Sequence, residues 1–309
     1  MKDILIVCNP NSGKGISVSV LQDYYNMLED VGYSVDMVFT KRPQHATEIV
    51  QNAKGYDTVI SFGGDGTLNE VVRGNSLRKD SMNVLPISLG SCNDVASMFG
   101  YIKSPTKNLK LAMTGEVKSI DIGTINEEPF TYVVGMGKFM NISYETSRNK
   151  KSRSGYLAYI KEGVKEFFDT PKSYQAQIEA DGIKLEDDYS LIMVSNSNHI
   201  AGVSNVYKDV ELDDEKLELL LCKSTNNSDL LFNFAMFYLG MKPKNIVCIK
   251  ANDIKIKLNE IPDKNWCIDG EKLSYNTKEY HIKANKRMDF IIPKEKINRL
   301  FREDNAINR

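Results

Sequence analysis

Histidine and cysteine are scarce in this chain of 309 residues, and neither is spaced as metal ligands are. The three histidines lie far apart, and the five cysteines are scattered without the paired spacing of a zinc site. This distribution excludes a structural zinc module. Scattered free thiols are typical of a reducing compartment, so we expect a cytoplasmic protein.

A net charge is also missing, because 40 Lys and Arg residues nearly cancel 41 Asp and Glu residues. No global basic field is available to attract nucleic acid, and we predict no such partner. The most apolar later stretch, Leu230 to Met241, falls short of the ~20 residues that cross a bilayer, so no transmembrane segment is predicted. We interpret it as a core helix with Ser228 as its N-cap; part of a lipid cleft is the alternative.

Two kinds of pattern divide the chain. Residues 1–122 alternate strand-like and helix-like segments, and this βαβαβαβα order predicts an α/β domain, a parallel sheet with helices on both faces. Residues 123–291 show short alternating segments separated by Gly, Asn, Asp and Pro, which are typical of a mainly antiparallel β-sandwich. A helical stretch lies in residues 292–309, and we expect it to pack back on the first domain.

Three glycines and an aspartate occur in ISFGGDGTLNEVV, residues 60–72, between an apolar strand and the start of a helix. Backbone N–H groups and the positive helix end bind phosphate at such a turn, and glycine lets the backbone approach closely. A carboxylate repels phosphate, so Asp65 implies Mg²⁺ or proton transfer. For this motif alone, an ordinary glycine-rich helix entry is the alternative.

Two further turns, CNPNSGKG at residues 8–15 and LGSCND at residues 89–94, follow other strands of the same predicted sheet. The carboxyl ends of parallel strands meet at one edge, where ligands bind in open α/β sheets. The first turn is no Walker P-loop, because Gly15 rather than Ser or Thr follows Lys14. We therefore expect the three turns to lie together around one phosphate site.

In this order and spacing, NPNSG, GGDGTLNEVV and GSCNDVA resemble the catalytic domain of the diacylglycerol kinase family of lipid kinases. ELDDEKLEL and CIDGE extend the resemblance to the soluble bacterial branch over nearly the whole chain. The resemblance implies an NAD-kinase/phosphofructokinase-like nucleotide-binding domain at residues 1–122 and a lipid-substrate domain at residues 123–291. NAD kinases share GGDG and remain an alternative.

The resemblance also implies an ATP site on the first domain. Three positions depart from the family pattern: Ser91 replaces the usual Thr but keeps the hydroxyl, Ser88 replaces a proline, and Ser97 replaces an arginine. The last two departures put the acceptor in question more than the reaction type. The implied nucleotide residues are Asn9, Pro10, Asn11, Ser12, Gly13, Thr40, Gly63, Gly64, Asp65, Gly66, Thr67, Asn69, Glu70, Ser91, Asn93 and Asp94.

The segment CIDGE, residues 267–271, is the predicted catalytic strand. Residues two apart on a strand share a face, so we expect Asp269 and Glu271 to project together. A hairpin corner at Asp-Gly is the alternative. The resemblance implies that Glu271 is the general base for a lipid hydroxyl, and that Asp65, Asp94 and Asp269 hold or assist a catalytic Mg²⁺.

A second acidic segment, VELDDEKLEL, occupies residues 210–219. The resemblance implies a structural metal ion held by the side chain of Asp214 and the backbone carbonyls of Glu211 and Lys216. The family often has Gly where Glu215 stands, so the loop geometry is open. A solvated acidic turn is the alternative.

The acceptor side carries a basic cluster, Lys150, Lys151 and Arg153, ahead of an aromatic-rich helical stretch. Such a cluster suits anionic lipid, and a solvated loop before a core helix is the alternative. Together the motifs predict an ATP- and Mg²⁺-dependent lipid kinase that meets its substrate at the inner membrane surface, with diacylglycerol converted to phosphatidic acid. NAD kinase and a non-catalytic lipid- or nucleotide-binding module are the alternatives, and a homodimer is compatible with the sequence.

Overall fold

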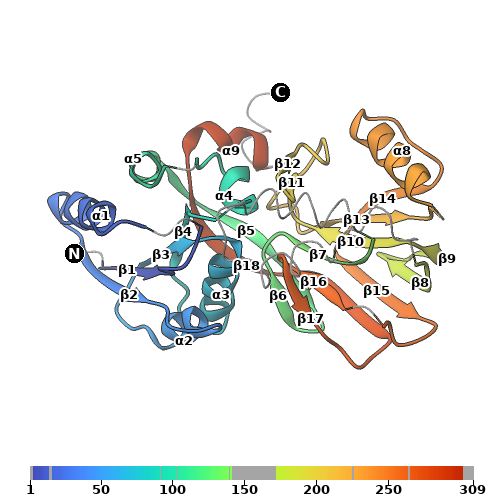
Figure 1. Cartoon of the computed structure of the whole chain (residues 1–309), viewed down its shortest axis with the longest axis horizontal. Coiled ribbons are helices and arrows are strands. Elements are labelled where there is room, and N and C mark those ends of the chain that lie inside the picture. The colour runs from blue at the N-terminus through green and yellow to red at the C-terminus, as the bar shows by residue number, and fades with distance from the viewer. Residues whose placement is uncertain are drawn as a thin grey trace. The chain divides into compact units, whose positions relative to one another are not determined.

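The computed structural model describes residues 3–13, 16–90, 92–102, 104–138, 140, 172–224, 226–263 and 265–301. The chain divides into two compact units (Figure 1). Unit 1 comprises Met1–Ile120, Glu211–Asp214 and Arg287–Arg309, and unit 2 comprises Asp121–Val210 and Glu215–Lys286.

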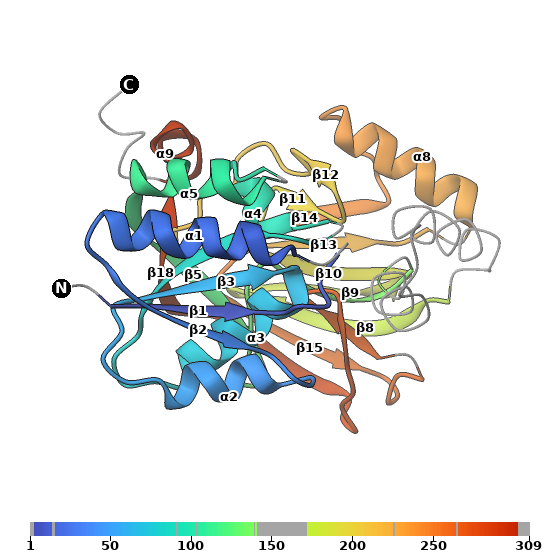
Figure 2. The same cartoon turned by 60° about the vertical axis from the view of Figure 1, so that its left-hand side comes forward.

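Unit 1 is built on parallel strands in the order β2-β1-β3-β4, followed by the end of β18. Helices α1, α4 and α5 lie on one face of this sheet, and α2 and α3 lie on the other (Figure 2). The predicted parallel α/β sheet is thus confirmed. The elements are β1 (Asp3–Cys8), α1 (Val18–Asp30), β2 (Ser34–Phe39), α2 (His45–Asn52), β3 (Thr58–Gly63), α3 (Asp65–Ser76), β4 (Asn83–Ser88), α4 (Asp94–Met98), α5 (Pro105–Met113) and α9 (Lys294–Leu300).

Burial explains the strands of unit 1. Five successive residues of β1, Ile4 to Cys8, are buried, as expected for a strand covered on both faces by helices. Helix α5 was not predicted from the sequence, although Pro105 opens its first turn, a position that proline favours. Chain order reverses between β1 and β3, which is the switch point where open α/β sheets bind ligands.

Two antiparallel sheets enclose the core of unit 2, which confirms the predicted sandwich. One has the order β14-β13-β10-β7-β16-β17, and the other contains β9, β8, β15 and the first part of β18, with β5 and β6 attached. The strands are β5 (Glu116–Ile125), β6 (Glu128–Phe130), β7 (Val133–Gly137), β8 (Tyr174–Ala180), β9 (Ile183–Tyr189), β10 (Leu191–Ser195), β11 (His199–Ile200), β12 (Val203–Ser204), β13 (Leu217–Cys222), β14 (Ile246–Ala251), β15 (Asp253–Leu258), β16 (Trp266–Ile268), β17 (Glu271–Leu273) and β18 (Glu279–Ile292).

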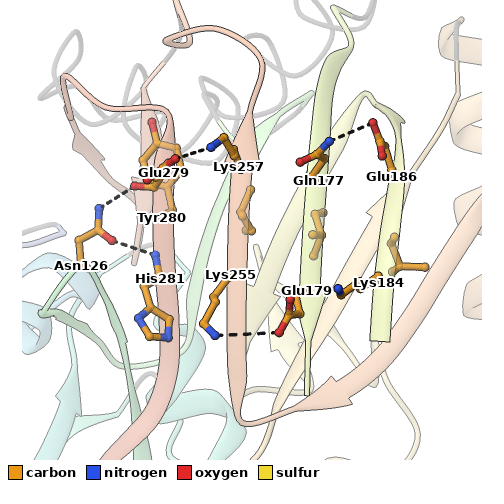
Figure 3. Close-up of a pocket in the computed structure, with 13 residues that line it drawn as sticks. Asn126, Gln177, Glu179, Lys184, Glu186, Lys255, Lys257, Glu279, Tyr280 and His281 are labelled. Carbon is orange, nitrogen blue, oxygen red and sulfur yellow. Dashed lines mark hydrogen bonds and ion pairs between the residues drawn. The ribbon is translucent and has the colours of Figure 1, made fainter. Parts of the chain in front are cut away.

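The outer face of the sheet that contains β8 and β15 is covered by paired charges (Figure 3). Lys257 pairs with Glu279 at 2.8 Å, and the amide of Gln177 donates to Glu186 at 3.2 Å. A hollow of about 880 Å³ lies over these strands. Its lining includes none of the residues predicted for the site, and most of its charged side chains are paired across strands. We interpret it as the solvent face of the sandwich.

Helix α8 (Asn227–Tyr238) corrects two predictions. Asn226, not Ser228, is its N-cap, because the Asn226 side chain accepts the N–H of Asp229 at 2.8 Å. The helix is also not a core helix, since only Leu230 and Asn233 are buried along it. Within the described residues, no helix has the length and hydropathy of a membrane span.

Candidate active site

Three loops leave the carboxyl ends of the adjacent strands β1, β3 and β4 in unit 1. The sequence predicted that these loops meet, and their contacts join them. The N–H of Asn9 donates to the carbonyl of Phe62 at 3.0 Å, and its side-chain amide donates to Thr67 Oγ1 at 3.2 Å. Its side-chain oxygen accepts the N–H of Asn11 at 3.0 Å. Asn9 therefore fixes the first loop to the start of α3.

Glycines allow these loops to touch backbone to backbone. A Cβ on Gly64 would lie 3.2 Å from the Cα of Gly90, and a Cβ on Gly90 would lie 2.8 Å from the Cα of Gly64. Gly13 has a φ of +59°, and a Cβ there would overlap the carbonyl of Leu89. Any larger residue would separate the loops, so this cradle requires glycine at these positions.

The third loop is held by its own side chains. Asn93 accepts the N–H of Gly90 at 2.8 Å and donates to the carbonyl of Gly90 at 2.9 Å, while its φ of 56° turns the chain into α4. Leu89 and Gly90 were not predicted as site residues. Gly90 follows two residues after the end of β4 at Ser88, and Gly64 directly follows the end of β3. This repeated pattern of a strand followed by glycine was the available signal.

The carboxylate of Asp65 joins two helices. Its two oxygens accept the N–H groups of Asn93 and Asp94, each at 2.8 Å, at the start of α4. Asp65 also lies in the first turn of α3, where a negative charge is favourable. The structure thus gives Asp65 a helix-capping role, and its predicted role toward Mg²⁺ stays a prediction.

The N-terminus of α3 fits a phosphate group. Its N-cap is Gly64, which supplies no side chain to the first-turn N–H groups of this described helix. An uncapped helix start beside a glycine cradle is a ready anion site. For Mg²⁺, the donor chemistry is also suitable, because Asp65 and the buried Asp94 carry hard oxygen donors and are joined by the hydrogen bond from the Asp94 N–H to the Asp65 carboxylate.

Glu70 is directed at another helix. Its two carboxylate oxygens accept the N–H groups of Gln44 and Ala46, at 2.9 and 3.0 Å, at the start of α2. The N–H of Thr40 donates to the carbonyl of Cys8, which places Thr40 beside the end of β1. The nucleotide contacts of Glu70 and Thr40 remain predictions. Ser91 lies outside the described residues.

In unit 2, Asp269 and Gly270 form a two-residue turn between β16 and β17. Their φ values are 46° and 83°, as in the type I′ turns that close hairpins. The prediction that Asp269 and Glu271 project from one strand face is therefore wrong. Asp-Gly satisfies the local rule for a hairpin corner, and that rule prevails here.

Asp269 is 2% exposed, and its carboxylate accepts three backbone N–H groups. They belong to Thr131, Tyr132 and Val133, at 2.6, 3.0 and 3.1 Å. The N–H of Asp269 in turn donates to the carbonyl of Val133 at 2.8 Å. Asp269 thus fixes the hairpin whose next strand begins with the half-buried Glu271. The neighbouring thiol of Cys267 is buried, which raises its pKa to about 12 and keeps it protonated.

Residues 211–216 pass from unit 1 into unit 2, and their metal site stays a prediction. Among the described residues, no three His, Cys, Asp or Glu side chains are grouped for a metal, although one carboxylate with two carbonyls would not form such a group. The basic cluster Lys150, Lys151 and Arg153, with the helix predicted after it, lies outside the described residues.

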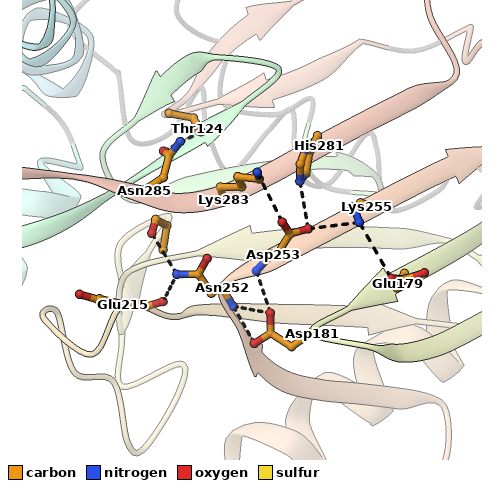
Figure 4. A network of polar contacts seen from close by, with 11 residues as sticks. Thr124, Glu179, Asp181, Glu215, Asn252, Asp253, Lys255, His281, Lys283 and Asn285 are labelled. Carbon is orange, nitrogen blue, oxygen red and sulfur yellow. Dashed lines mark hydrogen bonds and ion pairs between the residues drawn. The ribbon is translucent and has the colours of Figure 1, made fainter.

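Glu215 has a φ of 58°, the left-handed conformation that glycine adopts at least cost. Its N–H donates to Asp121 at 2.6 Å, and its carbonyl accepts from Asn252 at 2.7 Å (Figure 4). We expect Glu215→Gly to raise the free energy of unfolding by about 0.5–1 kcal/mol, because the left-handed strain exceeds the entropy cost of glycine. Urea unfolding of the wild type and of Glu215→Gly measures this difference in free energy. Glu215→Ala keeps the strain, and an equal gain in that variant would contradict the explanation.

Comparisons with known proteins agree with this geometry. Residues 3–125 match the family model described as the diacylglycerol kinase catalytic domain. The chain is 28% identical over 307 residues to a diacylglycerol kinase of Bacillus subtilis, covering 97% of this chain and 99% of that protein. It is 29% identical over 309 residues to a diacylglycerol kinase of Staphylococcus aureus, with 98% of each chain covered.

The fold has a solved counterpart. The crystal structure of a diacylglycerol kinase from Bacillus anthracis superposes with a TM-score of 0.73 at 24% identity, covering 96% of this chain and 98% of that one. The family model spans the three glycine loops, and the relatives cover the hairpin of Glu271 as well. The chain is therefore similar to bacterial diacylglycerol kinases over nearly its whole length, and residues 3–125 match the catalytic domain of that family of lipid kinases.

Proposed function

We propose that this protein transfers the γ-phosphoryl group of ATP to the hydroxyl of diacylglycerol and releases ADP and phosphatidic acid. The observation that carries the proposal is the uncapped N-terminus of α3 between the backbone-packed glycines of the second and third loops. The Bacillus subtilis and Staphylococcus aureus relatives are named diacylglycerol kinases, which supports diacylglycerol as the acceptor.

At the nucleotide site, the protein mainly has to position the phosphates of ATP and neutralise their charge. We assign the first-turn N–H groups of α3 and the loop of Asn9 to Gly13 to the phosphates. Asp65 and Asp94 are the proposed holders of Mg²⁺, which supplies charge neutralisation when bound. Because Asp65 also caps α4, the second and third loops are kept at a fixed spacing before the nucleotide arrives.

At the acceptor end, Glu271 is the proposed general base that takes the proton from the lipid hydroxyl as its oxygen attacks the γ-phosphorus. We assign Asp269 a positioning role rather than direct attachment to a metal. Its three backbone hydrogen bonds hold the turn that precedes Glu271, so the base is presented by a rigid hairpin.

The test is a transfer assay with γ-labelled ATP, Mg²⁺ and diacylglycerol in mixed micelles. We expect labelled phosphatidic acid, identified by mass. Sphingosine, monoacylglycerol and NAD serve as parallel acceptors. Labelling of NAD alone would make the protein an NAD kinase, and tight nucleotide binding without turnover of any acceptor would make it a binding module.

The glycine cradle gives a second prediction. Gly90→Ala places a methyl group 2.8 Å from both the Cα of Gly64 and Asn93 Oδ1, so the second and third loops must separate. We expect ATP affinity to fall by about tenfold or more and stability by about 1–3 kcal/mol. Isothermal titration measures the affinity.

Gly32→Ala is the control for this prediction. Nothing lies within 4 Å of the new methyl group there, so the substitution adds only backbone strain, and the affinity for ATP should not change. Equal affinities in the two variants would contradict the cradle.

A further inference from the structure

Helix α8 in unit 2 turns a second apolar face to solvent. Leu231, Phe232, Tyr238 and Leu239 are 47%, 62%, 51% and 71% exposed, and Met241 just beyond the helix is 50% exposed. Positions i, i+1, i+4, i+7 and i+8 share one side of a helix, so residues 231, 232, 235, 238 and 239 form a single stripe. The buried Leu230 and Asn233 lie on the opposite side. One apolar side of α8 packs on the protein, and the other is exposed to solvent. An exposed apolar side of this kind indicates an interaction site.

The exposed stripe is held firmly from beneath. Asn233 donates to Ser224 and to the carbonyl of Asp229, and Phe237 packs edge-on against Tyr207 with ring centroids 6.0 Å apart. Tyr238 donates to the carbonyl of Ser204 at 3.3 Å, which ties the end of the helix to the β11–β12 hairpin. The outer side chains are therefore presented by a helix that is held in place by these contacts.

The charge at the C-terminal end of the stripe is positive, while Asp229 in the first turn of α8 lies at the opposite end. From Leu230 to Asn252 the chain contains three lysines and no Asp or Glu. Lys250 pairs with Glu218 at 3.8 Å, whereas Lys242 and Lys244 are exposed and pair with no acidic side chain of the described residues. Lys208 lies against Gly240 at the same end of the helix. An apolar face thus ends in a group of lysines.

We propose that α8 docks this protein on a bilayer that contains anionic lipid. Phe232 and Leu239 would enter the interface between headgroups and acyl chains, and Lys242 and Lys244 would meet lipid phosphates, as in interfacial amphipathic helices. The proposal rests on the proposed function in one respect, because an enzyme that phosphorylates a bilayer lipid must reach that bilayer.

A second copy of this chain fits the same face less well. A two-fold interface brings a surface against itself, so the one carboxylate of α8 that could receive these lysines is Asp229 in the first turn. That carboxylate already accepts from the side-chain amide of Asn245 at 3.1 Å. In a bilayer that contains anionic lipid, by contrast, headgroup phosphates lie across the whole membrane surface. They can therefore pair with these lysines wherever the helix docks.

Flotation with large unilamellar vesicles of phosphatidylglycerol and phosphatidylcholine tests the docking directly, without ATP. We expect the wild-type protein to float with these vesicles, and Phe232→Ser with Leu239→Ser to lower the partition coefficient by about tenfold or more. Lys242→Gln with Lys244→Gln should lower it by about fivefold per lysine on anionic vesicles only. Leu77→Ser with Ile261→Ser, which changes residues 56% and 51% exposed elsewhere, is the matched control and should float like the wild type.

Unchanged flotation of the Phe232 and Leu239 double variant would overturn the proposal, as would an equal loss in the control. A change in solution mass from dimer to monomer, with vesicle binding intact, would assign the face to a second copy and overturn it too. A monomeric short-chain diacylglycerol separates this proposal from the kinase assignment: the double variant should lose turnover on vesicles but keep it on this soluble substrate. Absence of turnover on both by the wild type would reject the kinase, while the flotation result still decides the docking.

Discussion

Glu271→Gln will reduce turnover by about 10²–10⁴-fold, because an amide cannot accept the proton of the attacking hydroxyl. The change keeps the shape of the side chain at the start of β17, so the hairpin held by Asp269 should be retained. Nucleotide affinity should change less than about twofold, since the proposed phosphate ligands belong to unit 1. Initial rates of phosphatidic acid formation and ATP titration measure the two quantities.

Glu186→Gln is the matched control for this loss. Glu186 lies on the outer face of β9, accepts from Gln177 and lies outside the predicted site, so its variant should keep the full rate. Retention of more than about a tenth of the activity by Glu271→Gln would reject Glu271 as the base. The substitution would then have to be repeated at the other acidic residues of the site.

Asp269→Asn will lower the free energy of unfolding by about 3 kcal/mol. An asparagine keeps one acceptor oxygen but points an NH₂ group at N–H donors in a site that is 2% exposed, so buried donors lose their partner. Trp266, the single tryptophan of the chain, is buried three residues earlier in the same hairpin and reports its unfolding by fluorescence. Turnover should fall as well, because Glu271 loses its rigid support.

Asp181→Asn controls for the turn itself. Asp181 and Gly182 have φ values of 46° and 86°, nearly those of Asp269 and Gly270, and Asp181 also accepts backbone N–H groups, from Asn252 and Asp253 (Figure 4). Asp181 is exposed, so water can replace the lost partner and the cost should stay below about 1 kcal/mol. An equal loss of stability in Asp181→Asn and Asp269→Asn would contradict the effect of burial. Loss of activity in Asp269→Asn without a loss of stability would make Asp269 a metal ligand instead.

Much of unit 1 could be predicted from sequence because its signals are local. Buried apolar strands followed by Gly-rich turns and helical periodicity specify both the parallel sheet and the edge where its loops meet. The position of Gly63 and Gly64 at the end of β3 followed from this pattern alone. The contacts of Asp65 did not, since its partners lie 28 and 29 residues later, on a separate loop.

The hairpin in unit 2 shows the opposite case. Two local rules applied to CIDGE, strand alternation and Asp-Gly turn chemistry, and the sequence alone did not decide between them. The deciding partners, Thr131 to Val133, are 136 to 138 residues away along the chain. Helix α8 is similar, because apolar periodicity predicts a helix but does not show which of its two apolar sides meets the protein.

The chain contains three Asp-Gly pairs, at Asp65, Asp181 and Asp269, and all three carboxylates accept N–H groups from a distant segment. Among aspartate-containing dipeptides, Asp-Gly is the one most prone to isomerisation, because glycine leaves its backbone nitrogen unhindered. That nitrogen attacks the side-chain carboxyl carbon with loss of water, and hydrolysis of the ring can leave the backbone routed through the side chain. In the folded protein these hydrogen bonds hold each carboxylate in place against that attack. Unfolding removes this protection at all three sites together, so a chain kept unfolded accumulates isoaspartate at the residues that join its loops and strands and hold the β16–β17 hairpin.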